Sequence, residues 1–208
     1  MSKLFLITKY LIEAGFTTEV IQLFQEYYPN GITKWNLEEQ VELLKTPVRS
    51  CLGGFWKRGW IKNISMRGAN LSGLNLTRAN LRGANLTGTD LTEADLTETN
   101  LTGTFMYETN LYKANLYRAS LYKVNLTGAN LYRANLYRAN LYRANLIEVN
   151  LTGANLTGTN LSGADLTRAN FTETNIRHCY FNNTTFHKTI LTNTKLDPKI
   201  FYKYFLKK

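Results

Sequence analysis

The stretch 134–143, which reads ANLYRANLYR, decides the fold because it repeats a unit of five residues in register. A large apolar residue, usually Leu, recurs at every fifth position from Met66 to Leu191, which makes 26 units. A small residue, usually Ala or Thr, lies two places before it (minus two), and Asn or Asp usually lies one place before it (minus one). We call the apolar residue the centre and the two residues after it plus one and plus two.

A period of five fits neither an α-helix, which needs apolar spacing near 3.6, nor a strand, which needs 2. Self-similarity at a short fixed period is typical of solenoids, in which each unit buries its apolar residue by stacking on its neighbours. Centre and minus two are two residues apart, so we expect both to point inward, with plus one and plus two facing water. Asn or Asp at minus one favours a corner, because its side chain bonds nearby backbone.

The plus-one residues indicate how many sides each coil has. From residue 112 to residue 147 they read Tyr, Tyr, Tyr, Thr and then Tyr, Tyr, Tyr, Ile. Because stacked strands align like side chains about 4.8 Å apart, this superperiod predicts a four-sided coil of twenty residues.

The A-(D/N)-L-x-x pattern resembles the pentapeptide repeat family over roughly residues 64–195. The resemblance implies a mainly β fold, a right-handed quadrilateral β-helix. The minus-one residues depart from the pattern at Phe105, Ser120, Tyr180, Thr185 and Ile190. The last three predict that the regular coil degrades toward its C-terminal end.

We expect three parts: an N-terminal α-helical cap over residues 1–60, the β-helix over 61–194, and an amphipathic cap or tail over 195–208. Apolar residues at helical spacing and capping signals support the first part. Its aromatic residues Phe55, Trp56 and Trp60 are expected to plug the first coil, whose strand edges would otherwise be open. The alternative is that 1–60 is a separate helical module that binds a partner.

The C-terminal segment carries apolar residues at near-helical spacing with lysines between them: Ile200, Phe201, Tyr204 and Phe205. It either covers the last coil or forms a dimer contact, since members of the resembled family can pair through their C-terminal ends. The chain is therefore expected to be a monomer or a C-terminal-end dimer. Contact of this basic tail with an anionic membrane is the least favoured alternative.

Residues 111–143 carry six cations and no acid, and each cation follows a tyrosine. These candidate partner-binding pairs are Tyr112 and Lys113, Tyr117 and Arg118, Tyr122 and Lys123, Tyr132 and Arg133, Tyr137 and Arg138, and Tyr142 and Arg143. In a four-sided coil they form two stacked rows across three sides, with Glu93 and Glu98 aligned one coil before Lys113 and Arg118. Stacking and cation–π contacts alone explain the pattern, whereas a nucleic acid or other polyanion is the functional alternative.

A second candidate contact combines Phe105, Tyr107 and Ile147, which a twenty-residue coil places on one side together with Glu108 and Glu148. This mixed apolar and acidic side suits a protein partner. The alternative is that Phe105 is simply tucked against the coil.

No residues suggest catalysis, a cofactor, a metal or a small-molecule substrate, so we expect a protein that is not an enzyme. His178 and His187 should project from opposite sides of the coil and cannot share a metal. Cys51 and Cys179 should lie too far apart for a disulfide. No apolar run reaches about 18 residues and no signal peptide is seen, so we expect no membrane span and a cytoplasmic location.

These observations predict a non-catalytic scaffold with an unknown protein partner. Binding of nucleic acid or another polyanion through 112–143 is the alternative. Some members of the resembled family modulate DNA gyrase by imitating duplex DNA in shape and negative charge. The formal net charge of +10 argues against that role here.

Overall fold

The computed structural model describes residues 65–204, apart from the side chain of Phe201. The chain divides into two compact units, Met1–Leu52 and Gly53–Lys208, and the described residues belong to the second. The predictions made for residues 1–60, for Cys51 and for Phe205 lie outside the described residues.

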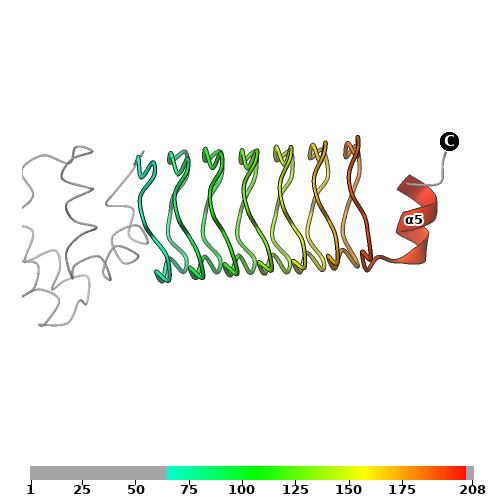
Figure 1. Ribbon diagram of the computed structural model, residues 1–208, viewed down its shortest axis with the longest axis horizontal. Coiled ribbons are helices and arrows are strands. Elements are labelled where there is room, and N and C mark those ends of the chain that lie inside the picture. The colour runs from blue at the N-terminus through cyan, green and yellow to red at the C-terminus, as the bar shows by residue number, and fades with distance from the viewer. Residues whose placement is uncertain (1–64, 205–208) are drawn as a thin grey trace, which may run out of the picture. The chain divides into compact units, whose positions relative to one another are not determined.

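The described chain winds into a stack of coils, which Figure 1 shows from cyan to orange along one axis. Parallel β-bridges join each minus-one residue to the residue twenty positions later, from Ser65↔Asn85 to Asn175↔Lys195. This spacing confirms the twenty-residue, four-unit coil. Each unit contributes a single isolated bridge in place of a longer strand.

The minus-one residues do not occupy the corners, and this part of the prediction was wrong. They lie at the bridges, in the middle of each side, and the turn falls on plus one and plus two. Their predicted bond to nearby backbone is present, since the Asn135 Oδ1 accepts a hydrogen bond from the amide of Tyr137, two residues on, at 3.2 Å. The Asn side chain therefore supports the corner that follows it.

The centre and minus-two residues fill the interior, as predicted. The exposed fraction is 0% at Leu136 and 1% at Ala134. Where Thr takes the minus-two position, its hydroxyl usually bonds a centre carbonyl 23 residues earlier, as Thr159 Oγ1 does to Leu136 at 2.7 Å, whereas Thr104 Oγ1 bonds the carbonyl of Leu101. Cys179 makes the same contact with Leu156 through its Sγ at 2.9 Å. The polar atoms of these buried side chains are thus paired.

The corners share one unusual backbone conformation. In all 26 units the plus-two residue has a positive φ, and 17 of these residues are not glycine. The amide of the next minus-two residue donates to the centre carbonyl, as from Ala139 to Leu136 at 2.9 Å. A positive φ at the third position is typical of a type II turn.

Every backbone amide of a central unit has an acceptor. In the unit Asn135–Ala139 the donors and acceptors are Asn135 to Ala114 O (2.9 Å), Leu136 to Asn155 O (2.7 Å), Tyr137 to Asn135 Oδ1 (3.2 Å), Arg138 to Thr157 O (3.0 Å) and Ala139 to Leu136 O (2.9 Å). Three of these five bonds reach a neighbouring coil. Since buried backbone donors must be paired, the stack rather than the single coil is the stable unit.

The C-terminal end of the stack is less regular. Bridges continue to Lys195, but Phe186 and Leu191 are only half-buried, and Tyr180 and Ile190 are 61% and 48% exposed. Burial thus declines as predicted, although the coil itself persists.

The helix α5, Pro198–Tyr204, follows the last bridge (Figure 1). The Tyr204 ring lies 5.9 Å from that of Phe181 and 6.4 Å from that of Phe186, measured between centroids. Its hydroxyl donates to the Asn182 Oδ1 at 3.1 Å. Just before the helix, the Asp197 Oδ2 accepts the His178 amide at 2.7 Å, in place of the backbone carbonyl that serves other units.

Candidate anion-binding belt

Six tyrosines and six cations between residues 112 and 143, which we call the belt, occupy three of the four corners over two successive coils. The tyrosines stack in pairs twenty residues apart: Tyr112 on Tyr132, Tyr117 on Tyr137, and Tyr122 on Tyr142. Each pair has a centroid distance of 5.8 Å, and the rings are within 11° of parallel. The structure therefore aligns the belt as the superperiod predicted.

Each belt cation lies over the ring of the tyrosine that precedes it. The distance from Lys Nζ or Arg Cζ to the ring centroid is between 5.1 and 5.3 Å in all six cases. Such contacts contribute about 0.5–1 kcal/mol each at exposed sites, so they support the stacking explanation of the pattern. They also mean that the rings are engaged with groups of the chain itself.

The first row of belt cations is partly neutralised by the preceding coil. Lys113 Nζ lies 3.4 Å from Glu93 Oε1, and Arg118 Nη1 lies 3.9 Å from Glu98 Oε1. Both pairings were predicted from the twenty-residue alignment. Hydrogen bonds with Tyr112 and with Glu93 raise the pKa of Lys113 above its ordinary value.

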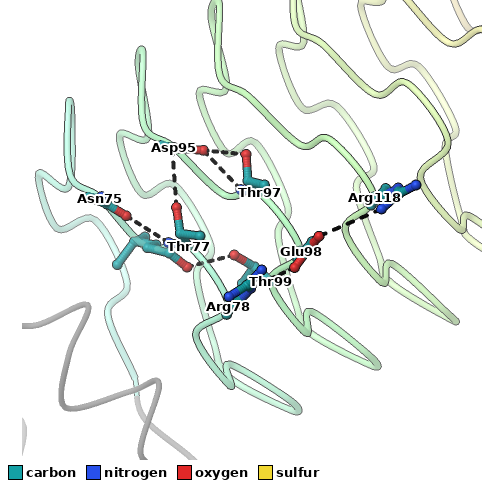
Figure 2. Close-up of polar contacts among 9 residues, drawn as sticks. Asn75, Thr77, Arg78, Asp95, Thr97, Glu98, Thr99 and Arg118 are labelled. Atoms are coloured by element: carbon teal, nitrogen blue, oxygen red, sulfur yellow. Dashed lines mark hydrogen bonds and ion pairs between the residues drawn. The ribbon is translucent and has the colours of Figure 1, made fainter.

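Figure 2 shows Glu98 between two cations of one column, with Arg78 on one side and Arg118 on the other. The Arg78 Nε donates to Glu98 Oε2 at 2.7 Å. This hydrogen bond and the charge of Arg78 lower the pKa of Glu98. A carboxylate at plus two therefore bridges cations one coil away in either direction.

The second row has no such acid. Arg133, Arg138 and Arg143 make no ion pair with any of residues 65–204, and neither does Lys123 of the first row. One coil later the plus-two residues are Gly153, Gly158 and Gly163. A Cβ atom at these glycines would lie 3.3, 3.4 and 3.2 Å from the Cγ of Arg133, Arg138 and Arg143 respectively. The second-row arginines thus extend beside bare backbone.

The acids at minus one have a structural role. Asp95 Oδ1 accepts hydrogen bonds from the amide and hydroxyl of Thr97 at 3.0 and 2.6 Å, and Oδ2 accepts one from Thr77 at 3.1 Å (Figure 2). Partial burial would raise the pKa of Asp95, but bonds from Thr97, Thr77 and Asn115 outweigh it and lower the pKa. The carboxylate acts here as the Asn amide oxygen does elsewhere.

The second candidate contact is partly assembled. Phe105 is 48% exposed and Tyr107 is 37% exposed. Their rings stack with a centroid distance of 6.4 Å and an interplanar angle of 9°. The Tyr107 hydroxyl accepts a hydrogen bond from Asn125 Nδ2 at 2.7 Å. Ile147 follows in the same column two coils later and is half-buried. Phe105 is therefore exposed rather than tucked away.

The histidines and the described cysteine do not form a chemical site. Within residues 65–204 no group of three or more His, Cys, Asp or Glu residues is placed to hold a metal. His178 Nδ1 lies 3.4 Å from Asp197 Oδ2. Burial raises the pKa of the free thiol of Cys179 to about 12, so it stays protonated and unreactive near neutral pH.

Sequence reasoning missed two features of the belt. The left-handed corner was not predicted, although nine glycines among the 26 plus-two residues were a signal for it. The glycines that follow the second-row arginines were also missed. Aligning the plus-two residues at intervals of twenty would have found them.

The model of the pentapeptide repeats family matches this chain in eight copies spanning residues 64–197. The match covers well over half of the 208 residues. The chain therefore belongs to the pentapeptide repeat family. No curated protein matches it in sequence.

Solved structures of other pentapeptide repeat proteins are similar to this chain. Full-length QnrB1, a plasmid-mediated fluoroquinolone resistance protein, is 17% identical with a TM-score of 0.38, covering 67% of this chain and 84% of its own. HetL, involved in heterocyst differentiation regulation in the cyanobacterium Nostoc sp. strain PCC 7120, is 26% identical with a TM-score of 0.26, covering 64% and 85%. A protein of the Arabidopsis thaliana thylakoid lumen is 28% identical with a TM-score of 0.29, covering 56% and 71%.

Among the described residues, no helix has the length and apolar character needed to span a membrane.

Proposed function

We propose that this pentapeptide repeat protein is a non-catalytic interaction scaffold whose partner is a protein, bound by outward side chains of the coils. The paired tyrosine columns carry this proposal, because they hold large side chains parallel at fixed spacing. Backbone bonds between coils fix the corners from which these side chains project. A surface that is ordered beforehand loses less entropy when a partner binds.

The right-handed sense of the coil, the helical cap of residues 1–60, the cytoplasmic location and a monomer or C-terminal-end dimer belong to the same proposal. The family resemblance supports the first and the last. Apolar residues at helical spacing support the helical cap, and the lack of a long apolar run motivates the location.

Site-specific photo-crosslinking tests the scaffold function. A photoreactive phenylalanine analogue replaces Tyr137 in the belt, Phe105 in the second candidate contact, or Thr172, two coils beyond the belt. We expect a discrete protein adduct from one of the first two positions and none from Thr172. Identical adducts from all three positions, or none from any, would contradict a defined protein-binding surface.

The belt supports a second candidate function, binding of nucleic acid or another polyanion. The four cations without an acid partner within residues 65–204 favour it, since exposed cations bind phosphates or carboxylates. The test is binding of labelled single-stranded and duplex oligonucleotides across a salt series, repeated with all six belt cations changed to Gln. Binding that falls steeply with salt and disappears in the variant is expected. Binding unchanged by the six substitutions, or no binding, would contradict it.

A further inference from the structure

We propose that the belt binds an acidic protein segment, and that it does so on one side of the coil, bounded by Arg138 and Arg143. We call this the anion side; Arg118 and Lys123 bound it one coil earlier. The inference rests on the proposed scaffold function and names the chemistry of the partner.

One corner of the coil is free of acids along its whole column. Its plus-two residues are Gly83, Gly103, Lys123, Arg143, Gly163 and Asn183. Each of the other three columns contains glutamate, for example Glu93, Glu98 and Glu148. Lys123 and Arg143 therefore repel one another across one coil with no neighbouring carboxylate to offset the repulsion. A bound carboxylate would remove this repulsion.

The following coil supplies no carboxylate of its own to the second-row arginines. Elsewhere in the solenoid an acid one coil away pairs with a cation, as Glu148 Oε1 does with Arg168 Nη1 at 2.9 Å. Glu98 does the same with Arg78 and Arg118 (Figure 2). Beside Arg138 and Arg143 the equivalent positions on the following coil are Gly158 and Gly163, which carry no side chain. The arginine stems lie against these glycines, and a partner carboxylate can approach their guanidinium groups with no carboxylate of the following coil in competition.

The middle of the anion side supplies a further donor. In a neighbouring column the Asn amides bond one another, as Asn135 Nδ2 does to Asn115 Oδ1 at 2.9 Å. On the anion side the residue one coil before Asn140 is Ser120, which has no amide oxygen to accept a bond from the Asn140 side chain. The Asn140 side chain is exposed, and its Nδ2 donates to no acceptor within residues 65–204. This amide lies between Arg138 and Arg143 and presents its N–H groups to a carboxylate oxygen.

The same geometry disfavours recognition of unpaired bases. Single-stranded nucleic acids are gripped by stacking bases on free aromatic faces. Here the belt rings stack on one another and lie beneath their own cations. From residue 65 to residue 195 the units are uniformly five residues long, so this part of the chain has no loop that protrudes into a groove of duplex nucleic acid. Carboxylates that pair with guanidinium groups need neither feature.

The test is binding of poly-L-glutamate to the full chain by fluorescence anisotropy, with two matched double variants. Changing Lys123 and Arg143 to Gln removes the acid-free corner. The control variant changes Lys113 and Arg133 to Gln. It also removes one Lys and one Arg from the same two coils, but from the first corner of the belt. We expect the first variant to bind at least tenfold more weakly and the second less than threefold more weakly. Equal losses would overturn the assignment to one side while leaving an anion-binding belt.

A second pair of variants adds the carboxylate within the chain. Gly163→Glu places it beside Arg143, and Gly153→Glu places it beside Arg133 with the same change of net charge. Glutamate adopts this left-handed corner at Glu93 and Glu98, with φ of 56° and 55°. The added Cβ atoms would lie 3.2 Å from Arg143 Cγ and 3.3 Å from Arg133 Cγ, so each flexible arginine stem must shift by a similar small amount, and we expect both variants to fold. Gly163→Glu should reduce poly-L-glutamate binding at least tenfold, and Gly153→Glu less than threefold.

Competition with a 20-base-pair DNA duplex identifies the class of partner. We expect poly-L-glutamate to bind more tightly than the duplex at equal charge concentration. Preference for the duplex, or no binding of poly-L-glutamate, would overturn an acidic protein partner. Preference for the duplex would leave the polyanion function of the belt in place. If poly-L-glutamate does not bind, the crosslinking experiment remains a separate test of the scaffold function.

Discussion

The belt coils and the last coil of this solenoid follow the same period of five. They differ in how completely they bury their centre residues. Leu136 and Leu141 are fully buried, whereas Leu191 is half-buried and Ile190 is 48% exposed. In the belt each coil has a neighbour on both sides. At the end the rings of Phe181, Phe186 and Tyr204 take over part of that covering. The difference shows that stacking completes the burial of the centre residues.

A buried charge in the belt is expected to have the largest effect. Leu136→Asp places a carboxylate at a fully buried centre, where an unpaired charge costs several kcal/mol. We expect loss of the cooperative thermal transition measured by circular dichroism. Asn155→Asp is the control, because Asp95 occupies the same column and the bridge partners Asn135 and Asn175 are uncharged. An unchanged melting temperature for Leu136→Asp would disprove the inward assignment.

Truncation of a centre residue compares the two regions directly. Leu136→Ala should lower the free energy of unfolding by about 2–5 kcal/mol, the usual cost of a buried Leu. Leu191→Ala should cost about 1–2 kcal/mol, because the side chain is only half-buried. Urea unfolding of both variants measures this. Equal losses would mean that the end of the stack is as tightly packed as the belt.

The minus-one residues give a smaller contrast. Asn135→Ala removes the bond from the Tyr137 amide and the ladder bond to Asn115, so we expect a loss of about 1–2 kcal/mol. Thr185→Ala changes the same position near the end of the stack and should cost less than about 0.5 kcal/mol. Urea unfolding again provides the measurement. A greater loss for Thr185→Ala would refute a special role for the Asn side chain.

Acid should have the smallest effect. The hydrogen bond from Arg78 lowers the pKa of Glu98 below 4.5, so the unfolded chain takes up this proton first as the pH falls. The resulting stabilisation is fully present above pH 4.5 and is lost as the pH drops through the lowered value. We expect Glu98→Gln to have a slightly reduced melting temperature at pH 7 and a flatter acid dependence between pH 5 and 3. Parallel acid dependences would show that the pair contributes nothing.

The period of five made the coil, its four sides and the inward residues predictable from sequence, because stacking forces like positions into register. It also predicted that Glu93 would meet Lys113. The left-handed corner was harder to predict, since 17 of its residues are not glycine and the strain is offset by bonds from other coils. The positions of the belt rings depend on side-chain torsions, which a repeat pattern does not specify. The contacts of Tyr204 depend on where the chain turns after Asp197, and periodicity carries no information about that.

The direction of the bonds between coils has a consequence for synthesis on the ribosome. The centre and plus-two amides of a coil donate to carbonyls 19 residues later, so the youngest coil of a growing chain has donors whose acceptors have not yet been made. At roughly 5–20 residues per second, twenty more residues take about 1–4 s to add. The nascent stack thus always carries an unfinished rim during translation. At the last of these bonds the acceptor changes: the Asp197 carboxylate accepts the His178 amide, while the Asp197 carbonyl, which the pattern would use, accepts the amide of Ile200.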